Sequence, residues 1–191
     1  MSLHQQLREG DLYTGVVSAS LYVLAEPSAN SGLLGRLEFH ATQHQCLWHL
    51  EHCTGLEKHA PVLFQLTADS ELDAWLGGLG GALACTVIEA ALPLEGIARH
   101  LRRFGKVQEG QRRFFLRLGD PRSLCLYVGS LTHRSDTLAR LFDHGRLRRL
   151  YLHDPRNGLA LGAQPLFEQT EGSGEREGCL AWLPLRQEIP A

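Results

Sequence analysis

The residues best suited to chemistry gather between positions 40 and 59, where the chain reads HATQHQCLWHLEHCTGLEKH. This segment holds five of the ten histidines and two of the five cysteines. Imidazole nitrogens and thiolates are the ligands that zinc prefers, so one hypothesis is a metal-dependent or thiol enzyme that uses this segment. Its candidate metal ligands are His40, His44, His49 and His52.

The spacing of these side chains favours a histidine-rich surface over a metal site. His40 and His44 are one helical turn apart, as two ligands on a helix would be. A zinc signature needs a close pair in each half of the site, and this segment has only one such pair. His52 and Cys53 are adjacent, and adjacent side chains rarely serve one tetrahedral ion. We therefore expect no metal and no other cofactor.

The glycine cluster GGLGG (77–81) has some likeness to a phosphate-binding loop. Such loops run from strand to glycine to helix, whereas the order here is helix, glycine, strand, so a helix terminus is the better interpretation. The sequence has no GxSxG, HExxH or paired-carboxylate motif, and no spacing links a Cys, a His and an orienting Asn or Asp. These observations predict a protein that is not an enzyme.

Charge is distributed unevenly, although the formal net charge is only −2. Residues 1–90 carry ten acidic and three basic side chains, and residues 91–191 carry eleven acidic and sixteen basic ones. Fourteen of the basic residues lie between 99 and 156. Such an asymmetry predicts a surface that is electrostatically complementary to a partner.

The basic stretch 99–122 is compatible with more than one function. Its arginines interleave with Phe104, Phe114 and Phe115, which suits a nucleic-acid-binding module, although no recognised module of that kind is present. FFLRL (114–118) can equally be a core strand whose aromatic side chains point inward. Because a basic face is more often solvated or bound to protein, a protein partner is favoured over nucleic acid.

The bulk properties are those of an ordinary globular protein. A length of 191 residues suits one domain with a sizeable core, and no apolar run is long enough to predict a membrane span. The N-terminus MSLHQQLREGDLY lacks the features of a signal peptide, so a cytoplasmic protein is expected. The cysteines are odd in number and form no CxxC pair, which argues against a disulfide framework. They are Cys46, Cys53, Cys85, Cys125 and Cys179.

Strands and helices alternate along most of the chain. Expected strands cover 21–26, 46–50, 61–66, 84–90, 146–154, 159–167 and 179–185, and expected helices cover 31–44, 68–81, 93–104, 120–131 and 133–145. Residues 106–118 predict a hairpin around Glu109–Gly110. The pattern favours a single α/β domain over 1–167, with a mixed central β-sheet flanked by helices. A short C-terminal extension, 168–191, would comprise an acidic flexible loop over 168–178 and a segment that returns to the core.

The run GIARHLRRFGKVQEGQRRFFLRLGDPRSL (96–124) resembles the adaptor-chaperone family of bacterial type VI secretion systems, long catalogued as a domain of unknown function. Members typically show a helix with HLRR, a hairpin containing Val, a strand of the form FRF, and a DPR that opens the next helix. Here these elements are His100–Arg103, Val107, Phe115–Arg117 and Asp120–Arg122. The segments LYVLAEP (21–27), PVLFQLTADSELDAWL (61–76) and TLARLFDHG (137–145) resemble the flanking blocks, so the resemblance covers roughly residues 20–145.

The resemblance implies a non-enzymatic adaptor chaperone. Such adaptors bind a toxic effector in the cytoplasm, keep it stable, and help to load it onto the spike protein of the secretion needle. The implied partners are thus an effector and the spike protein, without membrane or nucleic acid. Two features depart from the family pattern: Gly119 stands where an aromatic residue commonly precedes DPR, and strands with a loop replace the long C-terminal helical lobe of many members.

The DPR motif and the arginines around it are the candidate functional residues. Asp120 can cap a helix whose first position is Pro121, which makes this pair a structural motif. The arginines would offer a bidentate, salt-sensitive face to an acidic partner segment. These candidate partner-binding residues are Arg99, Arg102, Arg103, Arg112, Arg113, Arg117 and Arg122.

Overall fold

The computed structural model describes residues 1–10, 19–48, 55–166 and 175–184. Helices and strands follow one another along these residues, joined by short turns and single turns of 3₁₀-helix. In chain order they are α1 (Leu3–Glu9), β1 (Ser20–Ala25), α2 (Leu33–Phe39), β2 (His44–Cys46), β3 (Val62–Gln65), α3 (Glu71–Gly78), β4 (Cys85–Ala90), α4 (Leu94–Arg102), β5 (Lys106–Glu109), β6 (Arg112–Phe115), α5 (Pro121–Gly129), α6 (Ser135–Leu141), β7 (Leu147–Asp154), β8 (Leu159–Pro165), β9 (Glu175–Glu177) and β10 (Leu180–Pro184).

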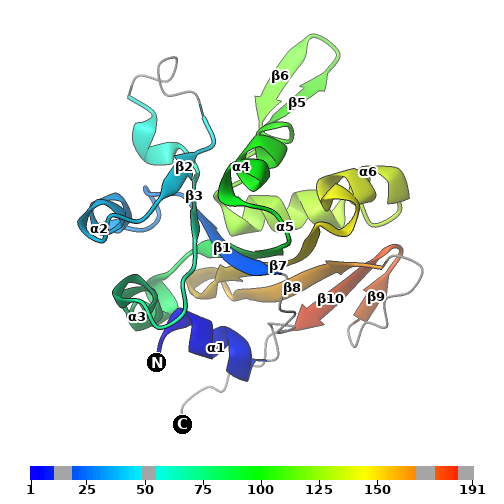
Figure 1. The fold of residues 1–191 in the computed structure, drawn as a ribbon. Coiled ribbons are helices and arrows are strands. Elements are labelled where there is room, and N and C mark those ends of the chain that lie inside the picture. Colours follow the sequence, from blue (N-terminus) through cyan, green and yellow to red (C-terminus); the bar gives the residue numbers. More distant parts are fainter. Residues whose placement is uncertain (11–18, 49–54, 167–174, 185–191) are drawn as a thin grey trace.

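Eight of the strands form one sheet in the order β2-β3-β1-β4-β7-β8-β10-β9 (Figure 1). The α/β class, with a central sheet flanked by helices, is therefore confirmed. The pairing is antiparallel at every contact between described strands, so the central sheet is antiparallel rather than mixed. The reason is that β1 pairs antiparallel with both β3 and β4. The helices that connect these three strands along the chain therefore do not join neighbouring parallel strands.

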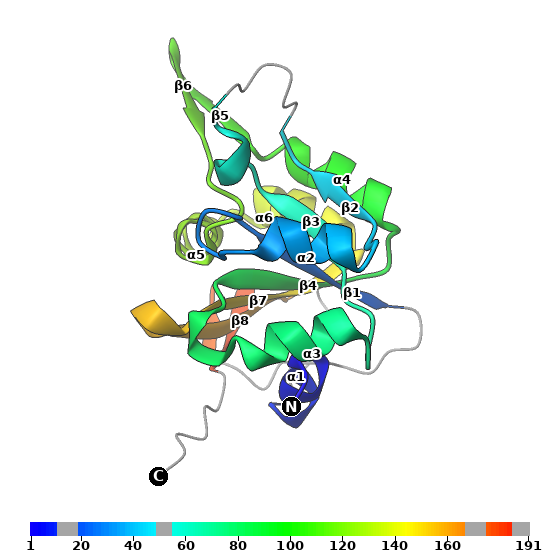
Figure 2. The ribbon, with the colours of Figure 1, turned by 90° about the vertical axis from the view of Figure 1, so that its left-hand side faces the viewer.

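Side chains alternate across the sheet and build a core on each face. On one face, Val23, Val87 and Tyr151 pack with leucines of α1, α2 and α3. On the other face, Leu24 and Ile88 pack with apolar residues of α4, α5 and α6. The sheet thus lies between two helical layers (Figure 2), and β4 is buried at every position.

The glycine cluster 77–81 ends α3, which confirms the helix-terminus interpretation. Gly77 and Gly78 are the last helical residues, and a short 3₁₀ turn follows over Gly80–Ala82. Gly77 also allows α1 to approach, because a Cβ at this position would lie 2.3 Å from the carbonyl oxygen of Met1. The glycine therefore serves helix packing.

Several element boundaries differ from those expected from the sequence, and α1 was not among the expected helices. The helix predicted over 31–44 ends at Phe39 because Ala41 adopts a left-handed backbone with φ +48°. The strand β2 occupies His44–Cys46 and so begins two residues before the strand predicted over 46–50, whose last two residues lie outside the described part of the chain. The loop predicted over 168–178 includes a strand, since Glu175–Glu177 form β9 and pair with β10. Residues 167–174 of that loop lie outside the described part of the chain.

Candidate partner-binding surface

The DPR region is joined to the first strand through a buried carboxylate. Glu26, which directly follows β1, has a side chain only 2% exposed. Its two oxygens accept hydrogen bonds from Nη2 of Arg117 at 2.9 and 3.1 Å, and Oε1 also accepts one from Ser28 Oγ at 2.6 Å. Nδ1 of His59 lies 3.1 Å from the same oxygen. Burial alone would raise the pKa of Glu26, but hydrogen bonds from Ser28, Arg117 and His59 outweigh it and hold the pKa below its usual value.

Asp120 begins α5 and continues this line of charges. Its Oδ1 accepts hydrogen bonds from the backbone N–H groups of Arg122 at 3.0 Å and Ser123 at 3.4 Å, while Pro121 occupies the first helical position. Nη1 of Arg117 lies 3.4 Å from Asp120, and Nε of Arg122 lies 3.6 Å from Asp120 and 3.5 Å from Asp154. Charges therefore alternate from the end of β1, through the start of α5, to the end of β7.

Gly119 stands where an aromatic residue commonly precedes DPR in the family, and the structure gives a steric reason for the glycine. A Cβ on Gly119 would lie 3.1 Å from the backbone nitrogen of Glu26 and 3.2 Å from the carbonyl carbon of Ala25. The chain before DPR thus passes directly against the end of β1, and glycine is the residue that permits this approach.

Three of the candidate partner-binding arginines already have partners inside the protein. Arg117 and Arg122 belong to the charge network just described, although about half of each side chain is exposed. Arg102 is half-buried, and its Nη2 donates to the backbone carbonyl of Cys46 at 2.7 Å, which ties α4 to β2. Sequence spacing could not reveal the contacts with Glu26, Cys46 and Asp154, because these partners come from distant parts of the chain.

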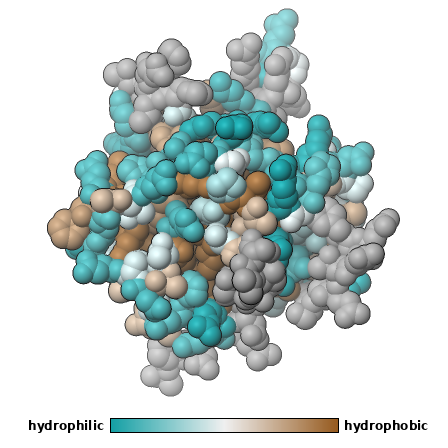
Figure 3. Space-filling view, in the orientation of Figure 1, coloured by the Kyte–Doolittle hydropathy of each residue, from teal (hydrophilic) through white to brown (hydrophobic). Residues whose placement is uncertain are grey.

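Four other basic side chains are exposed and form no ion pair with an acidic residue in the described part of the chain. We call them the basic face; they are Arg99, Arg103, Lys106 and Arg112. They lie on α4, at its end and on the hairpin that follows it, where strongly hydrophilic residues are visible in the space-filling view (Figure 3). The side chain of Arg113 lies outside the described part of the structure.

The hairpin also carries aromatic side chains that point outward. Phe114 is 46% exposed and Phe115 is 63% exposed, so the interpretation of FFLRL as a core strand with inward aromatics is wrong for these two residues. The reason is that β5 and β6 pair only with each other and form a separate two-stranded sheet, so their faces lie outside both cores. Leu118, at the end of the same run, is buried.

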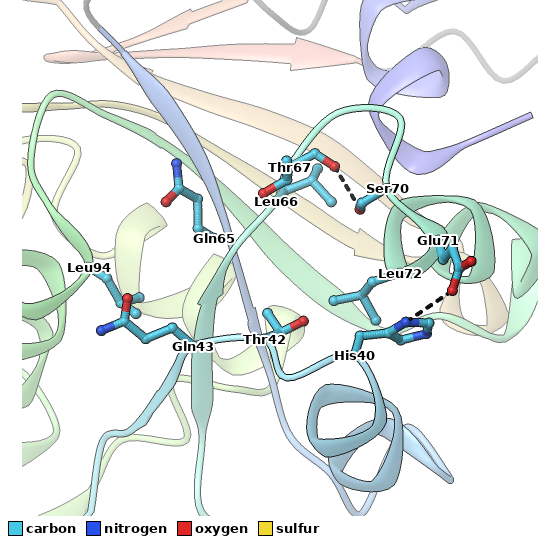
Figure 4. Close-up of a pocket in the computed structure, with 10 residues that line it drawn as sticks. All are labelled: His40, Thr42, Gln43, Gln65, Leu66, Thr67, Ser70, Glu71, Leu72 and Leu94. Carbon is cyan, nitrogen blue, oxygen red and sulfur yellow. Dashed lines mark hydrogen bonds and ion pairs between the residues drawn. The ribbon is translucent and has the colours of Figure 1, made fainter.

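A hollow of about 390 Å³ lies between the end of α2, the end of β3 and the start of α3 (Figure 4). Leu66, Leu72 and Leu94 contribute its apolar wall. At its edge, Nδ1 of His40 lies 3.4 Å from Oε2 of Glu71, so the pair joins a largely buried imidazole, 14% exposed, to a carboxylate that is 85% exposed. Its other lining residues are Thr42, Gln43, Gln65, Thr67 and Ser70.

The candidate metal ligands are not brought together within the described residues. His40 caps the end of α2, whereas His44 begins β2 and holds its Nδ1 2.9 Å from the carbonyl of Thr42, so the two do not share a helix face. His49 and His52 lie outside the described residues. Elsewhere in the described ranges, no group of three or more His, Cys, Asp or Glu side chains is placed to hold a metal ion.

Comparison with known proteins identifies a family. The family model described as "Domain of unknown function (DUF4123)" matches residues 21–137, from β1 into α6. No curated protein and no solved structure matches the chain. Among the described helices, none has the length and apolar character needed to cross a bilayer. The matched range takes in β1, the basic face and the DPR junction, and covers more than half of the sequence; the chain belongs to the DUF4123 family.

Proposed function

We propose that this protein is a non-enzymatic adaptor chaperone that binds a type VI secretion effector in the cytoplasm and helps to load it onto the spike protein. The observation that carries the proposal is the basic face. Arg99, Arg103 and Arg112 are exposed, and no acidic side chain in the described ranges pairs with them. The link to type VI secretion rests on the resemblance of the HLRR, FRF and DPR segments.

An arginine face of this kind suits a protein partner with acidic groups. Guanidinium groups form paired hydrogen bonds with carboxylates, which gives orientation as well as attraction. The attraction between exposed charges decays over about 8 Å at physiological salt and over a shorter distance at higher salt, so such a contact weakens as salt rises. The proposal therefore predicts a complex that survives purification at moderate salt and dissociates at high salt.

The first test is to purify the untagged protein from its native cytoplasm after nuclease treatment and to identify what accompanies it by mass spectrometry. A toxin-like or spike protein in near-stoichiometric amount supports the proposal. The nuclease step separates protein binding from bridging by nucleic acid. A preparation that carries no protein partner at moderate salt contradicts the proposal.

The second test reverses charge on the basic face. The Arg99→Glu/Arg103→Glu double variant should lower the affinity for the co-purified partner about tenfold or more, since each reversal replaces an attraction with a repulsion of similar size. Arg134→Glu/Arg140→Glu is the matched control, because it makes the same change at exposed arginines beside and on α6. Arg102 is left intact because it ties α4 to β2. Equal losses in both double variants would mean that net charge, and not the basic face, governs binding.

A further inference from the structure

The β5–β6 hairpin extends beyond the body of the protein. Both ribbon views show it projecting past α4 (Figures 1 and 2). Its strands have four residues each, and no third described strand pairs with either of them. A two-stranded hairpin is marginally stable alone in water, so further contacts along its faces or edges would stabilise it.

The hairpin displays two of the few large apolar side chains that the described surface exposes. Phe114 and Phe115 are neighbours on β6 and therefore point to opposite faces of the hairpin. The ring of Phe115 lies 6.2 Å from that of Trp48, which follows β2. One face of the hairpin is thus continued by the half-buried aromatic ring of Trp48.

Basic residues accompany these aromatics along the hairpin and at the end of the helix before it. Lys106 stands opposite Phe115 in the hairpin register, and Arg112 lies at the start of the same strand. Arg99 and Arg103 lie on α4 and at its end, just before the hairpin. All four are exposed and without an ion-pair partner among the described acidic residues. Residues 99–122 contain eight basic and two acidic side chains, so the local charge is strongly positive.

We infer that the hairpin is the docking element for an acidic segment of the client protein, with Phe114 and Phe115 receiving its large apolar side chains and the basic face pairing with its carboxylates. Phenylalanine and arginine are both enriched in the cores of protein interfaces, and arginine is also common among binding hot spots. The combination selects a segment that is both acidic and apolar, since either property alone would leave half of the surface without a partner. This inference rests on the proposed function, because the occupant that it names is the client.

The direct test uses the full-length protein and a synthetic dodecapeptide in which every third residue is Phe or Leu and the others are Asp or Glu. Fluorescence anisotropy of the labelled peptide measures affinity at low and at high salt. Phe114→Ser/Phe115→Ser should weaken binding at least about fivefold, and so should Arg99→Glu/Arg103→Glu. Phe39→Ser is the matched control, because Phe39 is 74% exposed on α2, away from the hairpin, and its replacement should leave affinity unchanged.

Several results would overturn the inference. One is wild-type affinity for the dodecapeptide in a Phe114→Ser/Phe115→Ser variant whose circular dichroism and melting temperature match the wild type. Others are the absence of peptide binding by the wild type, or tighter binding of a dT oligonucleotide that displaces the peptide. Sedimentation that shows a dimer lost in the same variant would identify a second copy as the occupant, which also overturns it. Should that variant unfold, Phe115→Ser alone replaces it and is judged by the same criterion.

The test of the hairpin as docking element and the test of the adaptor function can fail independently. If a client co-purifies from the native cytoplasm and binds the phenylalanine variant as well as the wild type, the docking element is wrong while the adaptor function stands. If the peptide binds through the hairpin but no client co-purifies, the docking element stands and the adaptor function fails.

Discussion

Removal of the guanidinium group that neutralises Glu26 should destabilise the fold measurably. Arg117→Met keeps the alkyl stem and deletes the charge, which leaves a carboxylate that is 2% exposed without its counter-ion. Stranding one member of a fully buried ion pair costs about 3–5 kcal/mol. Because 55% of the Arg117 side chain is exposed, and because Ser28 and His59 still contact the carboxylate, we expect about half of that, near 2 kcal/mol.

Thermal unfolding followed by circular dichroism is a suitable assay. For a domain of this size, about 2 kcal/mol lowers the melting temperature by roughly 4–8 °C. Arg122→Met is the matched control, since that side chain is equally exposed but lies 3.5 and 3.6 Å from its two carboxylates, and its loss should cost under about 1 kcal/mol. A double-mutant cycle of Arg117→Met with Glu26→Gln should give a coupling energy of about 1–2 kcal/mol. The reasoning is refuted if the two methionine variants melt at the same temperature, or if the cycle shows no coupling.

Three further predictions concern the same region and the core. Gly119→Ala should lower the free energy of unfolding by about 1–2 kcal/mol, because the new Cβ would press on the backbone beside Glu26. Gly35→Ala, in open space within α2, should instead raise the free energy of unfolding by about 0.5–1 kcal/mol. Urea titration of both variants checks this pair of predictions. Because the pKa of Glu26 lies below its ordinary value of 4.5, the Glu26 carboxylate stabilises the folded protein above that pH. This stabilisation is lost as the pH falls through the lower pKa of the folded state. The acid-induced drop in melting temperature should therefore be smaller in Arg117→Met than in the wild type. Burial raises the pKa of the Cys85 thiol to about 12 and leaves the side chain 0% exposed, so iodoacetamide at pH 8 should label Cys85 only as fast as the protein unfolds, and rapid labelling of the native protein would contradict this.

Local signals in the sequence were sufficient for much of the secondary structure. Ser70 caps α3, Asp120 and Pro121 begin α5, and Glu109–Gly110 lie at the turn of the hairpin, as the cap and turn residues predict. The α2 helix was predicted too long because nothing in its apolar pattern shows that Ala41 adopts a left-handed backbone. The antiparallel order of the sheet was also inaccessible, because it depends on which distant strands pair.

The candidate partner-binding surface stays a prediction, but the structure shows which of its residues have partners inside the protein. A run of arginines predicts a basic face, and four basic residues of 99–122 are exposed and have no ion-pair partner among the described acidic residues. The sequence cannot show that Arg102 contacts a carbonyl of β2, or that Arg117 meets a carboxylate 91 residues earlier. It also cannot distinguish an apolar strand that enters a core from a hairpin that stands apart, which is why the exposure of Phe114 and Phe115 was missed.

The pairing of β4 with β7 shows that the segment matched by the family model is not a complete folding unit. The family match ends at residue 137, before β7, and so covers β2, β3, β1 and β4 but none of the four strands on the other side of the sheet. A chain cut at that point would turn β4, buried at all six positions, into an open apolar edge. The limit of recognisable homology is therefore not a limit of autonomous folding: the shared segment reaches only the middle of the sheet, and the strands beyond it are needed to close β4 against solvent and against other chains.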